Sequence, residues 1–312
     1  MEPVIAANNL SCRYRRTEAV RDLTFAVEPG TIFGLLGPNG AGKTTTIRAL
    51  MNILRPSAGE VRVLGVNSRR LGAKELVEIG YVSENQQLPS WMTVRDLLAF
   101  CKPMYPTWDD GFAAKLVTDF DLPLNVRIAR LSRGMRVKAA LITALAYRPK
   151  LLVMDEPFSG LDPVVRDDLV RGVLERVGDG QWTVLLSSHD LDEVERLVDA
   201  IAFLDNGGLV LTEPLITLMS HFRRVEVTLP DGAAAAEAAD PAWIGRSAAG
   251  RVVQFVHSAY TGPGSDLEIG ARYPGARVDV DPMTLRDIFL AVARHTRGGN
   301  RLPSVNAEEV RS

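Results

Sequence analysis

The segment Gly37-Pro-Asn-Gly-Ala-Gly-Lys-Thr44 constrains the fold of this chain more than any other stretch. It matches the pattern G-x-x-x-x-G-K-[ST], in which glycines let backbone N–H groups converge on phosphate oxygens. A short apolar run at 31–37 precedes it, and residues 45–54 have the apolar spacing of a helix that stops before Pro56. Strand, glycine-rich loop and helix in this order predict a nucleoside triphosphate site, to which the helix N-terminus adds its positive dipole.

Within this phosphate loop, Gly37 to Thr44, two side chains have expected roles. Lys43 is expected to reach the β- and γ-phosphates, and the hydroxyl of Thr44 is expected to ligate Mg²⁺. The remaining contacts come from backbone N–H groups. The predicted nucleotide-binding residues here are Gly37, Pro38, Asn39, Gly40, Ala41, Gly42, Lys43, Thr44 and Thr45.

Two adjacent carboxylates, Asp155 and Glu156, follow the apolar run 151–154. Burial of carboxylates at the end of a strand costs free energy, which favours a functional role for them, although an isolated Asp-Glu pair is also common in solvated turns. With the phosphate loop upstream, we expect Asp155 to hold Mg²⁺ and Glu156 to polarise the attacking water. These residues, together with Lys43, are the predicted catalytic and metal-binding groups of the core.

His189 follows another apolar run, 183–188, at the carboxyl end of a predicted strand. Ligands of open α/β sheets gather at such ends, so His189 is a candidate for contacts to the γ-phosphate and the attacking water. Taken alone, the same residue also fits an ordinary turn or cap.

The order of elements predicts an α/β fold, a P-loop NTPase core with a mostly parallel sheet, over residues 1–220. Its interior strands are expected in short apolar runs, and a helical subdomain at about 88–145 interrupts them, with Thr93 and Ser132 as helix caps. Further helices are expected at 164–177 and 190–198. The predicted strands lie at 79–82, 151–154, 183–186 and 200–204.

The pattern changes after about Met219. Candidate strands at 225–229, 251–257 and 277–280 are followed by a helix with one apolar face. This predicts a small C-terminal α+β domain at 221–296, and the polar tail 297–312 is expected to be disordered. The apolar face of the closing helix consists of Leu285, Ile288, Phe289 and Val292.

Composition limits the other possibilities. The net charge is −2, with 36 basic and 38 acidic residues, so no general attraction to nucleic acid or anionic lipid is expected. Cys12 and Cys101 stand far apart and are expected to be reduced thiols, although a single disulfide is possible. No signal peptide and no run long enough to span a bilayer is visible. A membrane role would therefore require a separate partner.

Taken together, these motifs and their order resemble the ATP-binding cassette (ABC) family of ATPases, from about Val4 to Glu213. The family's signature LSGGQ is matched by Leu131-Ser-Arg-Gly-Met135, and its D-loop by 159–162. His189 matches the switch histidine, and Tyr14 stands where the family has an aromatic that stacks on adenine. The resemblance implies ATP and Mg²⁺ as cofactors and ATP hydrolysis as the activity.

Three positions depart from the family pattern. Arg133 replaces the first signature glycine, and Met135 replaces the glutamine. Glu84 stands where the family usually has glutamine, with Gln86 and Gln87 close behind. Glu84 still offers an oxygen to Mg²⁺ or to water, and it is kept as a metal candidate.

The resemblance also implies partners. In the family, two cassettes sandwich two ATP molecules, and Ser132 and Gly134 match positions that contact the γ-phosphate held by the other cassette. We therefore expect a homodimer or a paired second ABC ATPase, an integral membrane permease, no nucleic acid, and a cytoplasmic location at the inner face of the membrane. Segments 92–100 and 282–294 resemble ATPase subunits of bacterial ABC-2 type exporters.

The permease is expected to dock on the helical subdomain, where Trp91, Tyr105 and Trp108 are either exposed contacts or core residues. An alternative function is a soluble ABC ATPase that acts on nucleic acid or ribosomes, and a nucleotide-sensing regulator is a further one. The usual marks of the first alternative, namely coiled coils, paired cassettes or strongly basic regions, are not visible.

Overall fold

A six-stranded sheet, in the order β10-β9-β3-β8-β7-β6, forms the centre of the computed structural model. The structure describes residues 2–15, 17–84, 86–162, 166, 170, 182–233, 240–298 and 302. The pairs β3/β8, β3/β9, β6/β7 and β7/β8 are all parallel, which confirms the predicted mostly parallel sheet. The strands are β3 (Ile32–Leu36), β6 (Ile79–Ser83), β7 (Leu151–Asp155), β8 (Thr183–Ser188), β9 (Ala200–Asp205) and β10 (Gly208–Pro214).

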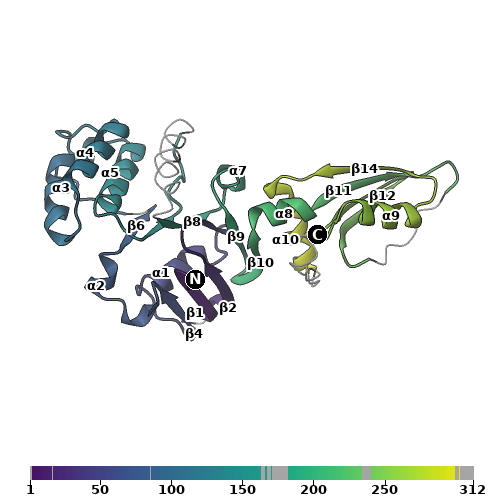
Figure 1. The fold of residues 1–312 in the computed structure, drawn as a ribbon, viewed down its shortest axis with the longest axis horizontal. Helices are drawn as coiled ribbons and strands as arrows, with labels where there is room; N and C mark the ends of the chain where they lie inside the picture. Colours follow the sequence, from purple (N-terminus) through teal and green to yellow (C-terminus); the bar gives the residue numbers. More distant parts are fainter. Residues whose placement is uncertain are drawn as a thin grey trace. The chain divides into compact units, whose positions relative to one another are not determined.

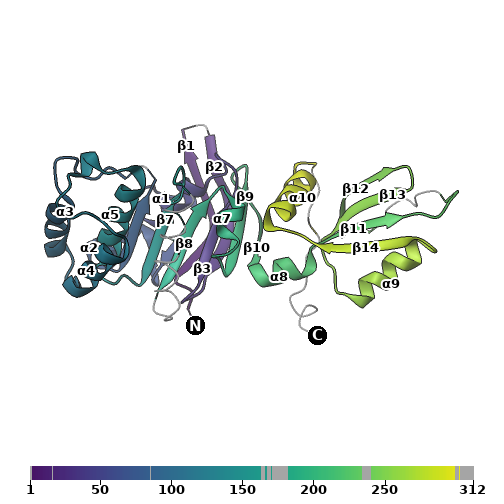
Figure 2. The same ribbon diagram turned by 90° about the horizontal axis from the view of Figure 1, so that it is seen from above.

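Strands β3, β7 and β8 are buried along their whole length. Continuous apolar strands are typical of parallel sheets that are covered on both faces, and this explains why their sequences do not alternate. The helix α1 (Lys43–Leu50) follows the phosphate loop, as expected. Figure 2 shows these strands side by side in the unit that runs from Met1 to Thr212.

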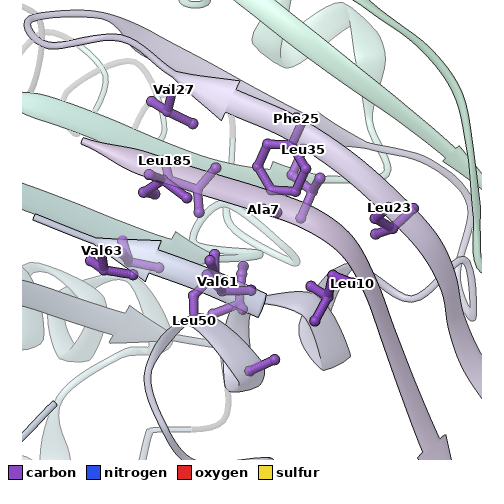
Figure 3. Packing of buried hydrophobic residues seen from close by; sticks show 14 of the residues in the cluster. Ala7, Leu10, Leu23, Phe25, Val27, Leu35, Leu50, Val61, Val63 and Leu185 are labelled. Atoms are coloured by element: carbon purple, nitrogen blue, oxygen red, sulfur yellow. The ribbon is translucent and has the colours of Figure 1, made fainter. Parts of the chain in front are cut away.

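A second, four-stranded sheet in the order β2-β1-β4-β5 was not among the predicted elements. Its strand β1 carries polar residues in its middle, a left-handed backbone at Asn9 (φ 49°) and breaks in register, so it shows no clean alternation. This sheet packs with α1 on the parallel sheet, and Figure 3 shows Phe25, Leu35 and Leu185 meeting in the shared core. The strands are β1 (Ile5–Tyr14), β2 (Thr17–Val27), β4 (Ala58–Val63) and β5 (Val66–Asn67).

The helical subdomain lies between β6 and β7 in the chain, and Figure 1 shows its three longest helices together beside β6. Side chains cap each of them: Thr93, Asp109 and Ser132 accept hydrogen bonds from N–H groups in the first turns. Its elements are α3 (Val94–Cys101), η2 (Lys102–Met104), α4 (Asp110–Asp119), η3 (Ile128–Arg130) and α5 (Arg133–Leu145).

Other segments of this unit differ from the sequence expectation. The helix expected at 190–198 is only α7 (Leu191–Val194), because turns take over after Glu195. The short elements η1 (Ser68–Arg70) and α2 (Ala73–Leu76) and strand β10 were not anticipated. The helix expected at 164–177 lies outside the described residues, apart from Arg166 and Val170.

The second unit, Glu213 to Ser312, begins earlier in the chain than the boundary expected at 220/221. It contains a four-stranded antiparallel sheet in the order β12-β13-β11-β14, on which α9 packs through Ile269 and Tyr273 (Figure 2). Its elements are α8 (Leu215–His221), β11 (Arg223–Thr228), β12 (Trp243–Ala249), β13 (Val252–His257), α9 (Pro263–Arg272), β14 (Arg277–Pro282) and α10 (Leu285–Arg297).

Strand β12 and helix α9 were missed by the sequence analysis. The sequence of β12, WIGRSAA, contains glycine, serine and alanine, which have low strand propensity. Trp243 nevertheless anchors it, because its indole stacks on Phe255 with the ring centroids 4.4 Å apart. Of the tail expected to be disordered, only Arg297, Gly298 and Leu302 are described. None of the helices in the described ranges has both the length and the apolar character to cross a membrane.

Leu185 tests the packing of the shared core. It lies in a central strand and its side chain is fully buried. Leu185→Ala should lower the free energy of unfolding by about 2–5 kcal/mol, because transfer energy is lost and a cavity remains. Ile53, 61 % exposed, is the control, and Ile53→Ala should change it by less than about 0.5 kcal/mol. Urea unfolding followed by circular dichroism measures both, and equal losses would contradict the packing described.

Candidate functional site

The phosphate loop requires glycine at two positions for steric reasons. Gly37 has φ 151°, and a Cβ there would overlap the carbonyl oxygen of Leu204 at the end of β9. Gly42 has φ 104°, and a Cβ would lie 2.6 Å from the carbonyl oxygen of Ala19 in β2. Strands of both sheets therefore lie so close to the loop that only glycine, which has no Cβ, fits at these two positions. The loop that sequence analysis assigned to phosphates is held in place by the fold itself.

Lys43 is the first residue of α1, and its side chain is almost completely buried. Its Nζ donates to the carbonyl oxygens of Gly37 at 2.7 Å and Pro38 at 3.2 Å, and it pairs with Oε1 of Glu156 at 3.0 Å. The side chains of Lys43 and Glu156 are only 5 % and 11 % exposed, so solvent screens this pair weakly. The structure thus brings together two of the predicted catalytic residues.

Asp155 ends β7 and faces Thr44 across the site. The Thr44 hydroxyl donates to Oδ1 of Asp155 at 3.1 Å, and Ser187 donates to the same oxygen at 2.8 Å. Burial raises the pKa of Asp155, and the two hydroxyl donors oppose that shift. A hydroxyl and a carboxylate oxygen this close are a donor set suited to Mg²⁺, which takes few protein ligands and keeps several waters.

Ser187 was missed by the sequence analysis. It pairs in register with Asp155 across the parallel strands β7 and β8, and its hydroxyl also accepts from the backbone N–H of Glu156 at 3.0 Å. The signal was available, because the two serines that end the run 183–188 must lie beside the carboxylates if the strands are neighbours. Strand order, however, does not follow from the local pattern.

Glu156 has a left-handed backbone, with φ 52°, which is unusual for a residue other than glycine or asparagine. In this conformation one carboxylate oxygen meets Lys43, and the other, Oε2, lies 2.7 Å from Nδ1 of His189. The His189 side chain is 41 % exposed, against 11 % for Glu156. The Glu156 carboxylate thus lies between the buried ammonium group of Lys43 and the more exposed imidazole of His189.

The remaining candidates lie outside this cluster. Ser132 caps α5 by accepting from the N–H of Met135 at 3.2 Å, and Gly134 is buried in the first turn. Among the described residues, no hydrogen bond of either reaches the phosphate loop. Tyr14 ends β1 and is 39 % exposed.

Glu84, a candidate metal ligand, is engaged in two ways. Its backbone N–H donates to the carbonyl oxygen of Asp155 at 2.9 Å, which places it beside the site. Its carboxylate Oε1 accepts from Nη2 of Arg133 at 2.9 Å and from the Ser159 hydroxyl at 3.0 Å. The Glu84 side chain is therefore directed toward the start of α5 and the loop after β7. Arg133 and Glu84 both depart from the family pattern in the sequence, but their pairing depends on a contact 49 residues apart that the sequence pattern does not reveal.

A family model described as ABC transporter matches residues 20–159. The Nod factor export ATP-binding protein I of Neorhizobium galegae is 36 % identical over 66 % of this chain and 60 % of its own length. The bacitracin transport ATP-binding protein BcrA of Bacillus licheniformis is 30 % identical over 74 % of this chain and 76 % of its own. The dimeric structure of an ATP-binding cassette bound to ADP and Pi matches with a TM-score of 0.61 and 21 % identity, over 68 % of this chain and 98 % of the other.

Ser187→Ala should destabilise the fold in a pH-dependent way. Because the pKa of Asp155 is raised in the folded chain, the free energy of unfolding falls as pH rises above the usual carboxyl range. Loss of the Ser187 donor raises this pKa further. The variant should lose about 1–3 kcal/mol near neutral pH, and the deficit should shrink at about pH 3, where Asp155 is mostly protonated in both the folded and the unfolded chain.

Urea unfolding at both pH values measures this deficit. Ser220→Ala is the matched control, since the exposed Ser220 hydroxyl donates only to the carbonyl oxygen of Thr217. A Ser187→Ala deficit that is the same at both pH values would contradict a role in keeping Asp155 ionised.

Proposed function

This chain belongs to the ABC transporter family of ATP-binding proteins, and on that premise we propose that it is the ATPase subunit of an exporter, acting as a dimer on a membrane-spanning partner. ATP binding and hydrolysis are the activity of the family. The observation that carries the proposal is the meeting of the phosphate-loop Lys43, the metal candidate Asp155 and the base candidate Glu156 at the carboxyl ends of β3 and β7.

Phosphate binding is assigned to the loop from Gly37 to Thr45. Its backbone N–H groups and the N-terminus of α1 favour anionic oxygens, and Lys43 adds a full positive charge. The carbonyl oxygens and the carboxylate that surround Lys43 keep its ammonium group directed into the loop. Tyr14 is assigned to adenine stacking by resemblance, in keeping with its exposed position at the end of β1.

Thr44 and Asp155 would hold Mg²⁺. When bound, the ion would neutralise charge that develops on the β- and γ-phosphate oxygens. The two hydroxyl donors on Asp155 favour its ionised form, the form that a metal requires. Glu84 remains a candidate only through its neighbouring position, because its carboxylate is engaged by Arg133 and Ser159.

Glu156 is assigned as the general base. Its Oε2 faces the exposed side of the site, where it can accept a proton from a water aligned with the γ-phosphate. His189, in contact with that same oxygen, orients the carboxylate and is positioned toward the same water. Lys43 holds the other oxygen, so rotation of the carboxylate is restricted from both sides.

A second copy is proposed to complete the site. Ser132 caps the 13-residue helix α5 and Gly134 lies in its first turn, and within the described part of the chain neither is hydrogen-bonded to the phosphate loop. A helix start carries free N–H groups that bind anions, and the resemblance assigns these to the γ-phosphate of a second cassette. The solved cassette of similar fold that is bound to ADP and Pi is described as dimeric.

The membrane partner is proposed to dock on the helical subdomain. Trp91, Phe100 and Met104 are 73 %, 50 % and 51 % exposed there, which is unusual for large apolar side chains. The other two aromatics considered in the sequence contribute less: Tyr105 stacks on Tyr147 at a centroid distance of 3.8 Å, and Trp108 is half-buried. Binding through this surface would place the chain at the inner face of the membrane.

Export is favoured by the relatives, one of which is described as a Nod factor export protein. The alternative of a soluble ATPase on nucleic acid or ribosomes has no support in the comparisons or in the net charge of −2. Purification of the chain from its native cells separates the two. Recovery with an integral membrane protein supports the exporter, and sedimentation with ribosomes or DNA would overturn it.

Glu156→Gln tests the base. We expect ATP to bind and to stabilise a dimer, while turnover falls by about 10²- to 10⁴-fold, because the amide cannot accept the proton. Equilibrium ATP binding, size-exclusion chromatography with ATP and a phosphate-release assay give the three readouts. Glu78→Gln, at the other end of the sheet, is the control and should turn over normally. Near-normal turnover by Glu156→Gln would remove Glu156 from this role.

Trp91→Ala tests the docking surface. The basal ATPase rate of the isolated chain should stay within about twofold, since Trp91 is a 73 % exposed residue of the helical subdomain, whereas co-purification with the membrane partner should drop sharply. Ile216→Ala is the matched control, because Ile216 is an equally exposed apolar residue, at 81 %, outside the helical subdomain. Equal recovery of the partner with both variants would place the docking surface elsewhere.

A further inference from the structure

Arg133 makes a three-way contact that the family pattern does not provide. It is the first residue of α5, and its Nη2 donates to Oε1 of Glu84 at 2.9 Å. The Ser159 hydroxyl donates to the same oxygen at 3.0 Å. Oε1 of Glu84, which follows β6, therefore links the start of α5 to the loop that follows β7.

The guanidinium also lies against the backbone of that loop. A Cβ added to Gly160 would stand 3.0 Å from Nη1 of Arg133, and Gly160 has φ 66°. Glycine thus serves two purposes here, since it permits the turn and leaves room for the guanidinium above it. Arg133 both pairs with Glu84 and covers the turn that contains Ser159.

This contact is linked to the backbone of the candidate base. The backbone N–H of Ser159 donates to the carbonyl oxygen of Glu156 at 3.3 Å, and that of Glu84 donates to the carbonyl oxygen of Asp155 at 2.9 Å. The two residues that share the carboxylate oxygen facing Arg133 therefore each donate a backbone N–H to one carbonyl of the Asp155–Glu156 turn. A left-handed residue such as Glu156 keeps its conformation only where its surroundings enforce it.

We propose that Arg133 is a positioning residue for ATP hydrolysis: by pairing with Glu84 it fixes Ser159 and, through Ser159, the turn that carries Glu156. Arginine suits this task because it stays charged and presents several donors in a planar fork. The inference rests on the proposed function, since it assigns Arg133 to the reaction of its own chain's Glu156. Ser132 and Gly134 remain assigned to the second copy.

The Lys150–Glu78 pair provides a matched control. It spans 3.0 Å and its side chains are 65 % and 42 % exposed, against 51 % and 34 % for Arg133 and Glu84. Glu78 precedes β6 and Lys150 precedes β7, so this pair lies at the other end of β6 from Glu84. Its loss removes an exposed ion pair from the same strand without touching the Glu156 turn.

The experiment compares Arg133→Met, Glu84→Gln and the double variant in the full chain with its membrane partner. Each single change should lower kcat about fivefold and leave the KM for ATP within about twofold. The double variant should be no worse than the poorer single variant, because both remove one interaction. Arg133→Lys should recover part of kcat, and Lys150→Met should match the unsubstituted complex.

Hydrogen exchange supplies a readout that is independent of turnover. Amides in 158–161 should exchange faster in Arg133→Met and Glu84→Gln, and at the usual rate in Lys150→Met.

Normal kcat in Arg133→Met, additive losses in the double variant, or a raised KM with unchanged kcat would overturn the proposal. The last result would assign Arg133 to the nucleotide of a second copy. If the unsubstituted complex shows no ATPase activity, the proposed function fails, and the exchange rates still test the positioning.

Discussion

The parallel register of β3, β8 and β7 is the constraint on which the site depends. Leu36 pairs with Ser188, and Ser187 pairs with Asp155, so the three strands end at one level. The phosphate loop follows β3 there, and Asp155 and Glu156, the carboxylates proposed for metal binding and catalysis, lie at the end of β7 there. Because all three strands are buried, a slip in register would expose apolar side chains and separate Thr44 from Asp155. The buried packing of the sheet therefore fixes how the phosphate loop and the two carboxylates lie relative to one another.

The charged side chains of the site differ in the partners that surround them. Lys43 is buried beside Glu156, while Asp155 relies on two hydroxyl donors and has a raised pKa because burial disfavours its charge. The two neighbouring carboxylates thus differ in environment, one paired with an ammonium group and the other with hydroxyls. That difference suits two roles, a base that contacts water and a ligand that a divalent ion can neutralise.

Local patterns predicted the parts of this protein that depend on neighbours in sequence. The phosphate loop, the caps Thr93 and Ser132 and the apolar strands all follow from such patterns, and the mostly parallel sheet is confirmed. What was missed depends on contacts across the fold. The role of Ser187 can be seen only once the order of the strands is known. The antiparallel sheet has an irregular register, so its strands show no clear alternation. Arg133 pairs with a residue 49 positions away in the sequence. Strand β12 is held by the stacking of Trp243, which its own composition does not reveal.

The left-handed backbone of Glu156 sets the stability of the fold against the contacts of its carboxylate. At φ 52° a glycine would be the less strained residue, and its presence would relieve strain on the order of 1 kcal/mol. It would also delete the carboxylate that meets Lys43 and His189. The backbone N–H of Glu156 donates to the Ser187 hydroxyl, and its carbonyl oxygen accepts from the N–H of Ser159, so hydrogen bonds on both sides hold the residue in this conformation. A chain with glycine at position 156 would thus be less strained, and its buried Lys43 would lose its ion pair.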